Sequence, residues 1–304
     1  LDVAGATTVV PDFAGEKLAD LVVLNDGDLS YGKLRFDERS IATLKSHLGN
    51  IEDSLTRALA WSAVWDMTRD GELAASDYVP MVLNALASET DVAVVATQML
   101  QLGTAVELYA ADKNRDALRT ILADGIEKLL DGAAAGSDMQ LQYVRSFAAS
   151  AKSPAQVSKV RDILDGKVAG VTVDANLRWT LLNSLVERGA ATVAEVEAEL
   201  ANDKSADGEK AAAFGRAVGA DAAVKAAAWE LATTKDISNH IQIQTIQGFN
   251  RPGQRELTAP YADKYFDLIL DYWTSHTYEF ASNIALLAFP SYQDALNNDS
   301  VHAR

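Results

Sequence analysis

Cysteine is absent from the 304-residue sequence, which excludes disulfides, thiolate catalysis and cysteine-ligated metal sites. Positive charge is scarce, because 27 lysines and arginines face 43 aspartates and glutamates and the formal net charge is -16. A chain this acidic lacks the basic surface that neutralises phosphates, so we expect no nucleic-acid partner and no membrane partner. No signal peptide or apolar run of transmembrane length is evident, which favours a cytoplasmic protein or a piece of one.

Motifs that carry catalysis are also missing. Neither the G-x-x-x-x-G-K-[ST] nor the G-x-G-x-x-G phosphate loop occurs. No histidine belongs to the H-E-x-x-H pattern, which places two zinc ligands and a glutamate base on one helix. We therefore expect surface or capping roles for the four histidines, which are His47, His240, His276 and His302.

One stretch begins like a calcium-binding loop. Asp26, Asp28 and Ser30 have the required spacing, but Tyr31 replaces the glycine of the sixth position and Asp37 the glutamate of the twelfth. We expect a turn here rather than a metal site.

The chain does contain recurrent helical patterns. Ser54–Leu73 is apolar on more than one face, which is typical of a helix that lies between neighbours. Ser153–Gln156, Thr192–Glu195 and Ser88–Asp91 have the spacing of capping boxes, and Ser76 is a further candidate cap. Paired helices at intervals of roughly 35–40 residues predict an all-α fold, an α-α superhelix of irregular HEAT- or armadillo-like repeats. We expect the five tryptophans to be core anchors rather than a ligand cage: Trp61, Trp65, Trp179, Trp229 and Trp273.

Residues 1–36 differ from the rest of the chain. Residues 7–10 and 21–24 are rich in β-formers, and residues 33–36 alternate polar and apolar side chains as a half-buried strand does. A few short strands cannot bury a sheet face alone, so they either complete a sheet elsewhere or pack on the first helices. We expect two parts, a short β segment over 1–36 and a helical repeat domain over 37–304.

Candidate binding residues lie in a loop that interrupts the helices. Residues 248–255 contain Arg251 and Arg255, and a guanidinium fork matches the geometry of a carboxylate. The alternative is that both arginines pair with local acids such as Glu256 or Asp263.

Two helical cations, Arg178 and Lys225, are further candidates for substrate contact, because cationic side chains are scarce in this chain.

Several segments together resemble bacterial aminopeptidase N enzymes. Residues 24–38 resemble the segment that joins the β-sandwich to the helical domain of that family. Two further sets of residues resemble later parts of the family domain. Its middle helices are matched by residues 176–179, 203–204 and 225–229. Its late helices are matched by residues 248–249, 252–254, 259–261, 265–266 and Trp273. The resemblance covers essentially the whole chain.

The resemblance implies a cap domain of a zinc aminopeptidase. The family's H-E-x-x-H, its downstream zinc-ligand glutamate and its G-A-M-E-N motif do not occur here, so no catalytic or metal role is carried over. It implies zinc in a catalytic domain of the same polypeptide, a helical bowl over the cleft, and peptide substrates whose distal end meets the bowl. An acidic cavity favours entry of a cationic amine. The fragment alone should be inactive.

Two other functions remain open from the sequence. One is a free-standing helical-repeat scaffold that binds another protein on its concave face. The other is an unrelated all-α enzyme with an acid–base pair of shifted pKa.

Overall fold

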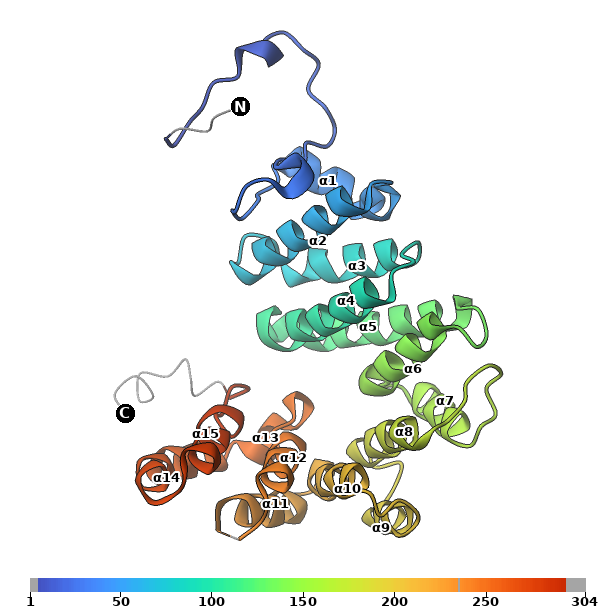
Figure 1. The fold of residues 1–304 in the computed structure, drawn as a ribbon, viewed down its shortest axis with the longest axis vertical. Helices are drawn as coiled ribbons and strands as arrows, with labels where there is room; N and C mark the ends of the chain where they lie inside the picture. The colour runs from blue at the N-terminus through green and yellow to red at the C-terminus, as the bar shows by residue number, and fades with distance from the viewer. Residues whose placement is uncertain (1–4, 235, 294–304) are drawn as a thin grey trace. The chain divides into compact units, whose positions relative to one another are not determined.

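A computed structural model describes residues 5–234 and 236–293, and within these ranges it is helical and contains no strand (Figure 1). The all-α class is thereby confirmed, whereas the superhelical repeat type stays a prediction. The α-helices are α1 Glu38–His47, α2 Ser54–Arg69, α3 Ala75–Leu86, α4 Val92–Thr104, α5 Asp112–Gly132, α6 Asp138–Ser150, α7 Pro154–Leu164, α8 Ala175–Glu187, α9 Val193–Asn202, α10 Ala206–Val218, α11 Ala222–Thr234, α12 Asn239–Phe249, α13 Arg255–Thr258, α14 Tyr261–Ser275 and α15 Tyr278–Leu287. Short 3-10 turns and one π-helical segment, η4 Ala105–Tyr109, complete the fold.

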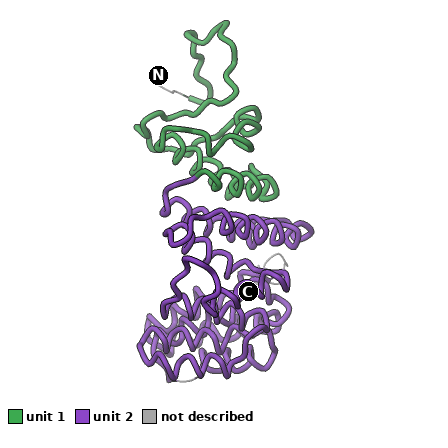
Figure 2. The backbone as a smooth tube through the Cα atoms, turned by 90° about the vertical axis from the view of Figure 1, so that its right-hand side faces the viewer, with its two compact units in different colours: residues 1–88 green, residues 89–304 purple. Residues whose placement is uncertain are grey.

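The chain forms two compact units, Leu1–Ser88 and Glu89–Arg304 (Figure 2). In the first unit, α2 contacts α3 and buries Trp61 and Val64, as the apolar pattern of Ser54–Leu73 predicts. Asp53 caps α2 by accepting a hydrogen bond from the Thr56 amide. The expected division into residues 1–36 and 37–304 stays a prediction, because the boundary between the two compact units falls after Ser88.

The predicted N-terminal β segment is not confirmed. The described part of residues 1–36 contains short 3-10 turns and extended backbone but no ladder. Lys33 and Arg35 instead pair with Asp70 just after α2, and Phe36 is buried with its amide directed at Met67 Sδ. Packing on a helix therefore accounts for the alternating pattern of residues 33–36. The described residues contain no second strand that could form ladder hydrogen bonds with this segment.

The calcium-like stretch is a turn, as expected. Asn25 adopts a left-handed backbone conformation, and its side chain bonds the Ser30 amide and the Asp28 carboxylate. An asparagine that holds its own turn accounts for the clustered polar residues.

Two helix starts differ from the sequence expectation. Ala74, not Ser76, precedes α3 and offers no side-chain cap. Asp91, not Ser88, caps α4 by accepting bonds from the amides of Ala93 and Val94.

The second unit stacks its helices in two rows (Figure 1). Successive members of one row are in contact: α4 with α6, α6 with α8, α8 with α10, and α10 with α12. The helices α5, α7, α9 and α11 flank this row. The loop between α12 and α13 returns to the start of the unit, because Arg119 donates to the Pro252 carbonyl and Arg255 to the Glu107 carbonyl.

By length and composition one helical stretch in the described residues, Val92–Tyr109, could cross a membrane, with a mean hydropathy of 1.2. The sequence analysis expected none. Core helices pass the same test, and Val95, Leu102 and Val106 are fully buried within this unit. Glu107 at its end pairs with Arg119. This single stretch is weak evidence for a span.

Candidate functional site

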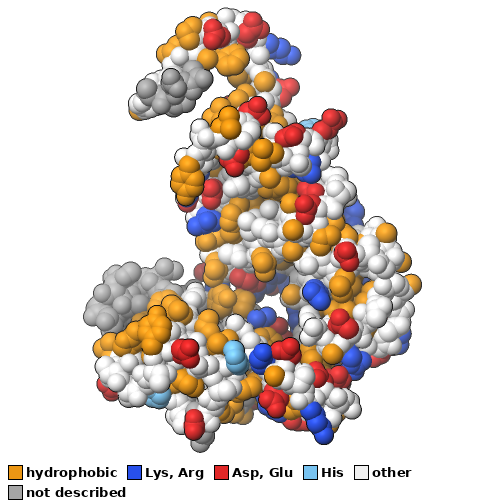
Figure 3. All heavy atoms as spheres, in the orientation of Figure 1, with side chains coloured by type: hydrophobic (Ala, Val, Ile, Leu, Met, Phe, Trp, Pro, Cys, Tyr) orange, Lys and Arg blue, Asp and Glu red, His pale blue; other side chains and the backbone are white. Residues whose placement is uncertain are grey.

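A cavity of about 550 Å³ lies in the second unit, between the row of helices and the α12–α13 loop. We call it the α8 cavity. It is lined by Arg145, Ala149, Asn176, Trp179, Thr180, Asn183, Ser184, Glu187, Asp207, Ala211, Phe214, Gln244 and Arg251. This volume suits a small molecule or part of a peptide. Figure 3 shows a hollow in this unit with lysine or arginine side chains at its edge.

One face of α8 supplies nearly half of the lining. Asn176, Trp179, Asn183 and Glu187 are three or four residues apart and so share a side of the helix. The opposite side carries Leu177, Leu181 and Leu185, which are fully buried. Asp174 caps the helix at the Leu177 amide, 2.8 Å away. Core packing therefore fixes the rotation of α8 and directs its polar face to the cavity.

A close approach between α8 and α10 sets the cavity wall. Asn183 is buried and donates through Nδ2 to the Ala211 carbonyl at 3.0 Å. Its Oδ1 has no hydrogen-bond partner and lies where a Cβ on Gly215 would be. Glycine at position 215 therefore allows the side-chain amide of Asn183 to pack against α10, where a Cβ would clash with it.

Arg251 lines the cavity, and its guanidinium is braced. Nε and Nη2 donate to the carboxylate of Glu187 at 2.8 and 3.1 Å, and the Phe214 ring centroid lies 5.5 Å from Cζ. Burial lowers the pKa of Arg251, but the charge and hydrogen bond of Glu187 outweigh burial and raise the pKa above its usual value. The partner is thus a residue 64 positions away, not the local Glu256 or Asp263.

The other three predicted contacts lie elsewhere. Arg178 pairs with Glu199 of α9, and Arg255 donates to the Glu107 carbonyl. Lys225 is fully buried. The substrate-contact role of all four residues stays a prediction, and of the four the structure brings Arg251 alone to the cavity.

Sequence reasoning missed Arg145, on α6. It lines the cavity, is exposed, and has no hydrogen bond or ion pair to another residue within 5–234 and 236–293. A guanidinium that lines a cavity without a partner among the described residues has N–H donors that a ligand could use. Arg145 lies inside a regular helix, where no local sequence pattern marks it.

The described residues do not offer a set of side chains arranged to bind a metal ion. Within residues 5–234 and 236–293 no group of three or more histidine, aspartate or glutamate side chains could hold a metal ion. His276 stacks on Tyr272 with ring centroids 3.7 Å apart, while His302 lies outside the described residues. The resemblance places zinc in another domain of the parent enzyme, and we derive no step through a metal.

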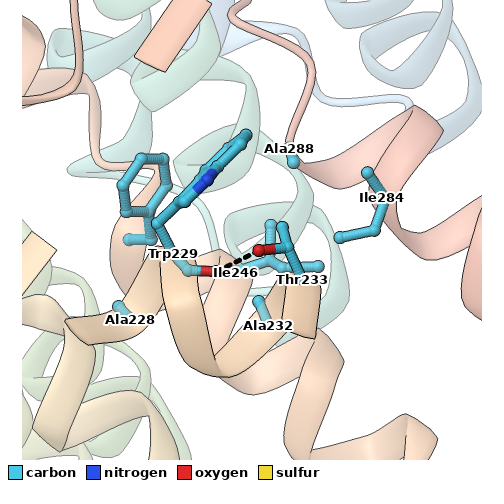
Figure 4. A pocket seen from close by; sticks show the side chains of 8 residues that line it. Ala228, Trp229, Ala232, Thr233, Ile246, Ile284 and Ala288 are labelled. Atoms are coloured by element: carbon cyan, nitrogen blue, oxygen red, sulfur yellow. Dashed lines mark hydrogen bonds between the residues drawn. The ribbon is translucent and has the colours of Figure 1, made fainter. Parts of the chain in front are cut away.

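A second cavity is a packing gap rather than a site. It measures about 10 Å³ and is enclosed by apolar side chains of α11, α12 and α15, including Trp229, Ile246 and Ile284 (Figure 4). Its one hydroxyl, on Thr233, already donates to the Trp229 carbonyl. A gap of this size is at the limit for one water.

The tryptophans are mostly core anchors, as expected. Trp61 and Trp179 are buried, and Trp65 and Trp229 half-buried. Trp273 differs, because it is 47% exposed; its ring packs nearly at right angles to that of Tyr278.

Comparisons with known proteins agree with the resemblance noted in the sequence. Residues 21–303 match the family model described as ERAP1-like C-terminal domain. The chain is 42% identical over 296 residues to aminopeptidase N of Streptomyces lividans, an alignment that covers 96% of this chain and 34% of that protein. The chain thus spans about a third of the length of this relative.

Proposed function

The chain belongs to the ERAP1-like C-terminal domain family, and from this premise we propose that it is the non-catalytic C-terminal cap domain of a zinc-dependent aminopeptidase that removes N-terminal residues from peptides. The sequence similarity to an aminopeptidase N extends over nearly the whole chain, which favours a cap domain over a free-standing scaffold. Zinc and the catalytic domain would belong to another part of the same polypeptide. A cytoplasmic location stays a prediction.

The α8 cavity is the observation that carries a role in substrate binding. It combines the polar amides of Asn176 and Gln244 with the apolar walls of Trp179 and Phe214. Amides pair with any peptide backbone, and rings contact side chains without strict selection. We infer that the cavity receives the part of a peptide distal to the bond that is cleaved.

Two arginines would divide the recognition of a peptide's terminal carboxylate. Arg145 has all of its donors available and would bind the carboxylate directly. Arg251 has Nε and Nη2 committed to Glu187, so Nη1 remains to face a ligand. Glu187 positions Arg251 and partly neutralises it, which keeps the cavity open to uncharged peptide segments.

The domain would contribute positioning rather than bond chemistry. Holding the distal end of a peptide lowers the entropy lost when its amino end is placed for reaction. Covering the cleft removes water from the reacting groups. The zinc of the parent enzyme would supply Lewis-acid chemistry, outside this chain.

The test is Arg145→Gln in the full-length enzyme, with peptides of increasing length and a single-residue anilide as substrates. We expect KM for long peptides to rise about tenfold or more, since a charge-assisted hydrogen bond contributes about 1.5–3 kcal/mol. The anilide, which does not reach the cavity, should keep its KM. Arg216→Gln, which removes an outer ion pair with Glu197, is the matched control. An unchanged length profile would contradict the proposal.

A further inference from the structure

Three cavity-facing side chains of α8 are bound to residues outside that helix. Two of them, Asn183 and Glu187, hold α10 and the α12–α13 loop through hydrogen bonds. The third is Trp179, whose indole Nε1 donates to Oδ2 of Asp203 at 2.8 Å. Because the three are spaced four residues apart, they form one row along the helix. The α8 wall of the cavity is therefore held at both ends and in the middle.

Asp203 lies in the short connection between α9 and α10. Its Oδ1 accepts from the Ser205 amide at 3.2 Å, so the carboxylate is held from two sides. Gly208 leaves room for it, since a Cβ there would lie 2.8 Å from Asp203 Oδ2 and 2.3 Å from its carbonyl oxygen. Hydrogen bonds from Ser205 and then from Trp179 lower the pKa of the Asp203 carboxyl below its usual value. The acceptor at neutral pH is therefore a carboxylate, and the bond to the indole is charge-assisted.

The ring of Trp179 forms a boundary of the α8 cavity. Trp179 is 4% exposed although it lines the cavity, so the ring is packed into the wall and does not stand free in the space. An indole turns about two side-chain torsions, and a bond at Nε1, far from Cβ, restrains both. The same bond ties α8 to the start of α10, which supplies Asp207 and Phe214 to the lining. Asp203 therefore restrains both the ring and the spacing of two cavity walls.

We propose that Asp203 is a positioning residue that fixes the Trp179 indole as a rigid stop in the α8 cavity, and that this stop limits the size of the peptide side chain that the cavity admits. Asp203 does not line the cavity in the described structure, so it acts on a ligand only through the ring. A fixed ring excludes a bulky side chain by contact, whereas a ring that can turn yields to it. The inference rests on the proposed function for the identity of the ligand, which is the distal end of a peptide.

Two long peptides that differ only in their last residue, alanine or tryptophan, test this selection in the full-length enzyme. Asp203→Ala should lower the ratio of KM for the tryptophan peptide to KM for the alanine peptide by about tenfold, the scale of a steric mismatch in a pocket. Trp179→Phe should lower the ratio likewise, and the double variant no further, because both changes remove the same bond. The kcat for both peptides should stay unchanged.

Ser205→Ala is the matched control for damage to the start of α10. It removes the hydroxyl that accepts from the Gly208 amide, but it keeps the backbone amide that donates to Asp203. The KM ratio should therefore stay at its natural value. If Asp203→Ala does not fold, Asp203→Asn takes its place and should shift the ratio in the same direction by a smaller factor. A ratio that moves with Ser205→Ala, one that neither Asp203 variant moves, or additive effects in the double variant would overturn the proposal.

The hydrogen bond itself is followed without substrate by NMR of the full-length enzyme labelled with ¹⁵N in its tryptophans. The Trp179 Nε1–H signal, assigned by its loss in Trp179→Phe, should exchange with solvent at least about tenfold faster in Asp203→Ala than in the natural protein. Unchanged exchange would overturn the proposal.

The two readouts separate a failure of this inference from a failure of the proposed function. Faster indole exchange with an unchanged KM ratio would overturn the role of Asp203 in selection. If Arg145→Gln still raises KM for long peptides in that case, the cavity remains a peptide site. If Arg145→Gln has no effect either, the proposed function fails as well.

Discussion

The ion pair between Arg251 and Glu187 should be the most strongly coupled pair at the cavity. Replacing Arg251 by methionine leaves the Glu187 carboxylate, among the residues that the structure describes, with an ion pair to Arg188, whose Nη1 lies 3.7 Å from Oε2. It also removes the contact between the guanidinium and the Phe214 ring. Both effects lower the free energy of unfolding.

The exposure of the pair sets the expected magnitude. Breaking a fully buried ion pair costs about 3–5 kcal/mol. The side chains of Arg251 and Glu187 are 28% and 17% exposed, so solvent screens part of the interaction. We therefore expect Arg251→Met to cost about 2 kcal/mol, between the values for buried and surface pairs.

A double-mutant cycle measures the coupling. Arg251→Met, Glu187→Gln and the double variant are unfolded in urea, and the same transition is compared in each. We expect the double variant to be more stable than the sum of the single changes by about 1–2 kcal/mol. Arg216 and Glu197, 41% and 49% exposed, form the control cycle and should couple by less than about 1 kcal/mol. Additive effects at Arg251 and Glu187 would refute the reasoning.

Other predictions concern packing and capping. Gly248→Ala should destabilise the chain by about 1–3 kcal/mol, because its Cβ would meet the Phe214 carbonyl, whereas Gly103→Ala, with open space around it, should be neutral or stabilising; urea unfolding compares them. Thr192→Ala should cost about 1 kcal/mol by the same assay, because it removes the cap of α9. Hydrogen bonds from Thr56 lower the pKa of Asp53, so its contribution is present above the unfolded carboxyl pKa and lost as pH falls through the lower folded pKa. Stability of Asp53→Asn against pH should lack this loss.

Local signals in the sequence predicted most of the helices. Ser153 and Thr192 form complete capping boxes where the pattern places them, and Asp174 caps α8 in the same way through a side-chain bond. These contacts join residues three positions apart, so sequence spacing determines them. Residues 33–36 alternate like a strand, yet alternation reports only which side chains are buried, not what covers them.

The candidate site was less accessible from sequence. The irregular loop directed attention to Arg251, but its partner Glu187 lies on another helix and no local pattern links them. Lys225 was selected as a cation, whereas the fold buries it against two carbonyls. The position of Arg145 at the cavity could not be predicted from the sequence, because it depends on how the helices pack.

Photo-cross-linking in the full-length enzyme tests the central claim most directly. A peptide with a photoreactive group at its carboxyl end would be bound under conditions that prevent turnover, irradiated, and its attachment points mapped by mass spectrometry. The account predicts attachment to lining residues of the α8 cavity on α8, α10 and α12, such as Trp179, Phe214 and Gln244. Attachment confined to surfaces outside this cavity would contradict it.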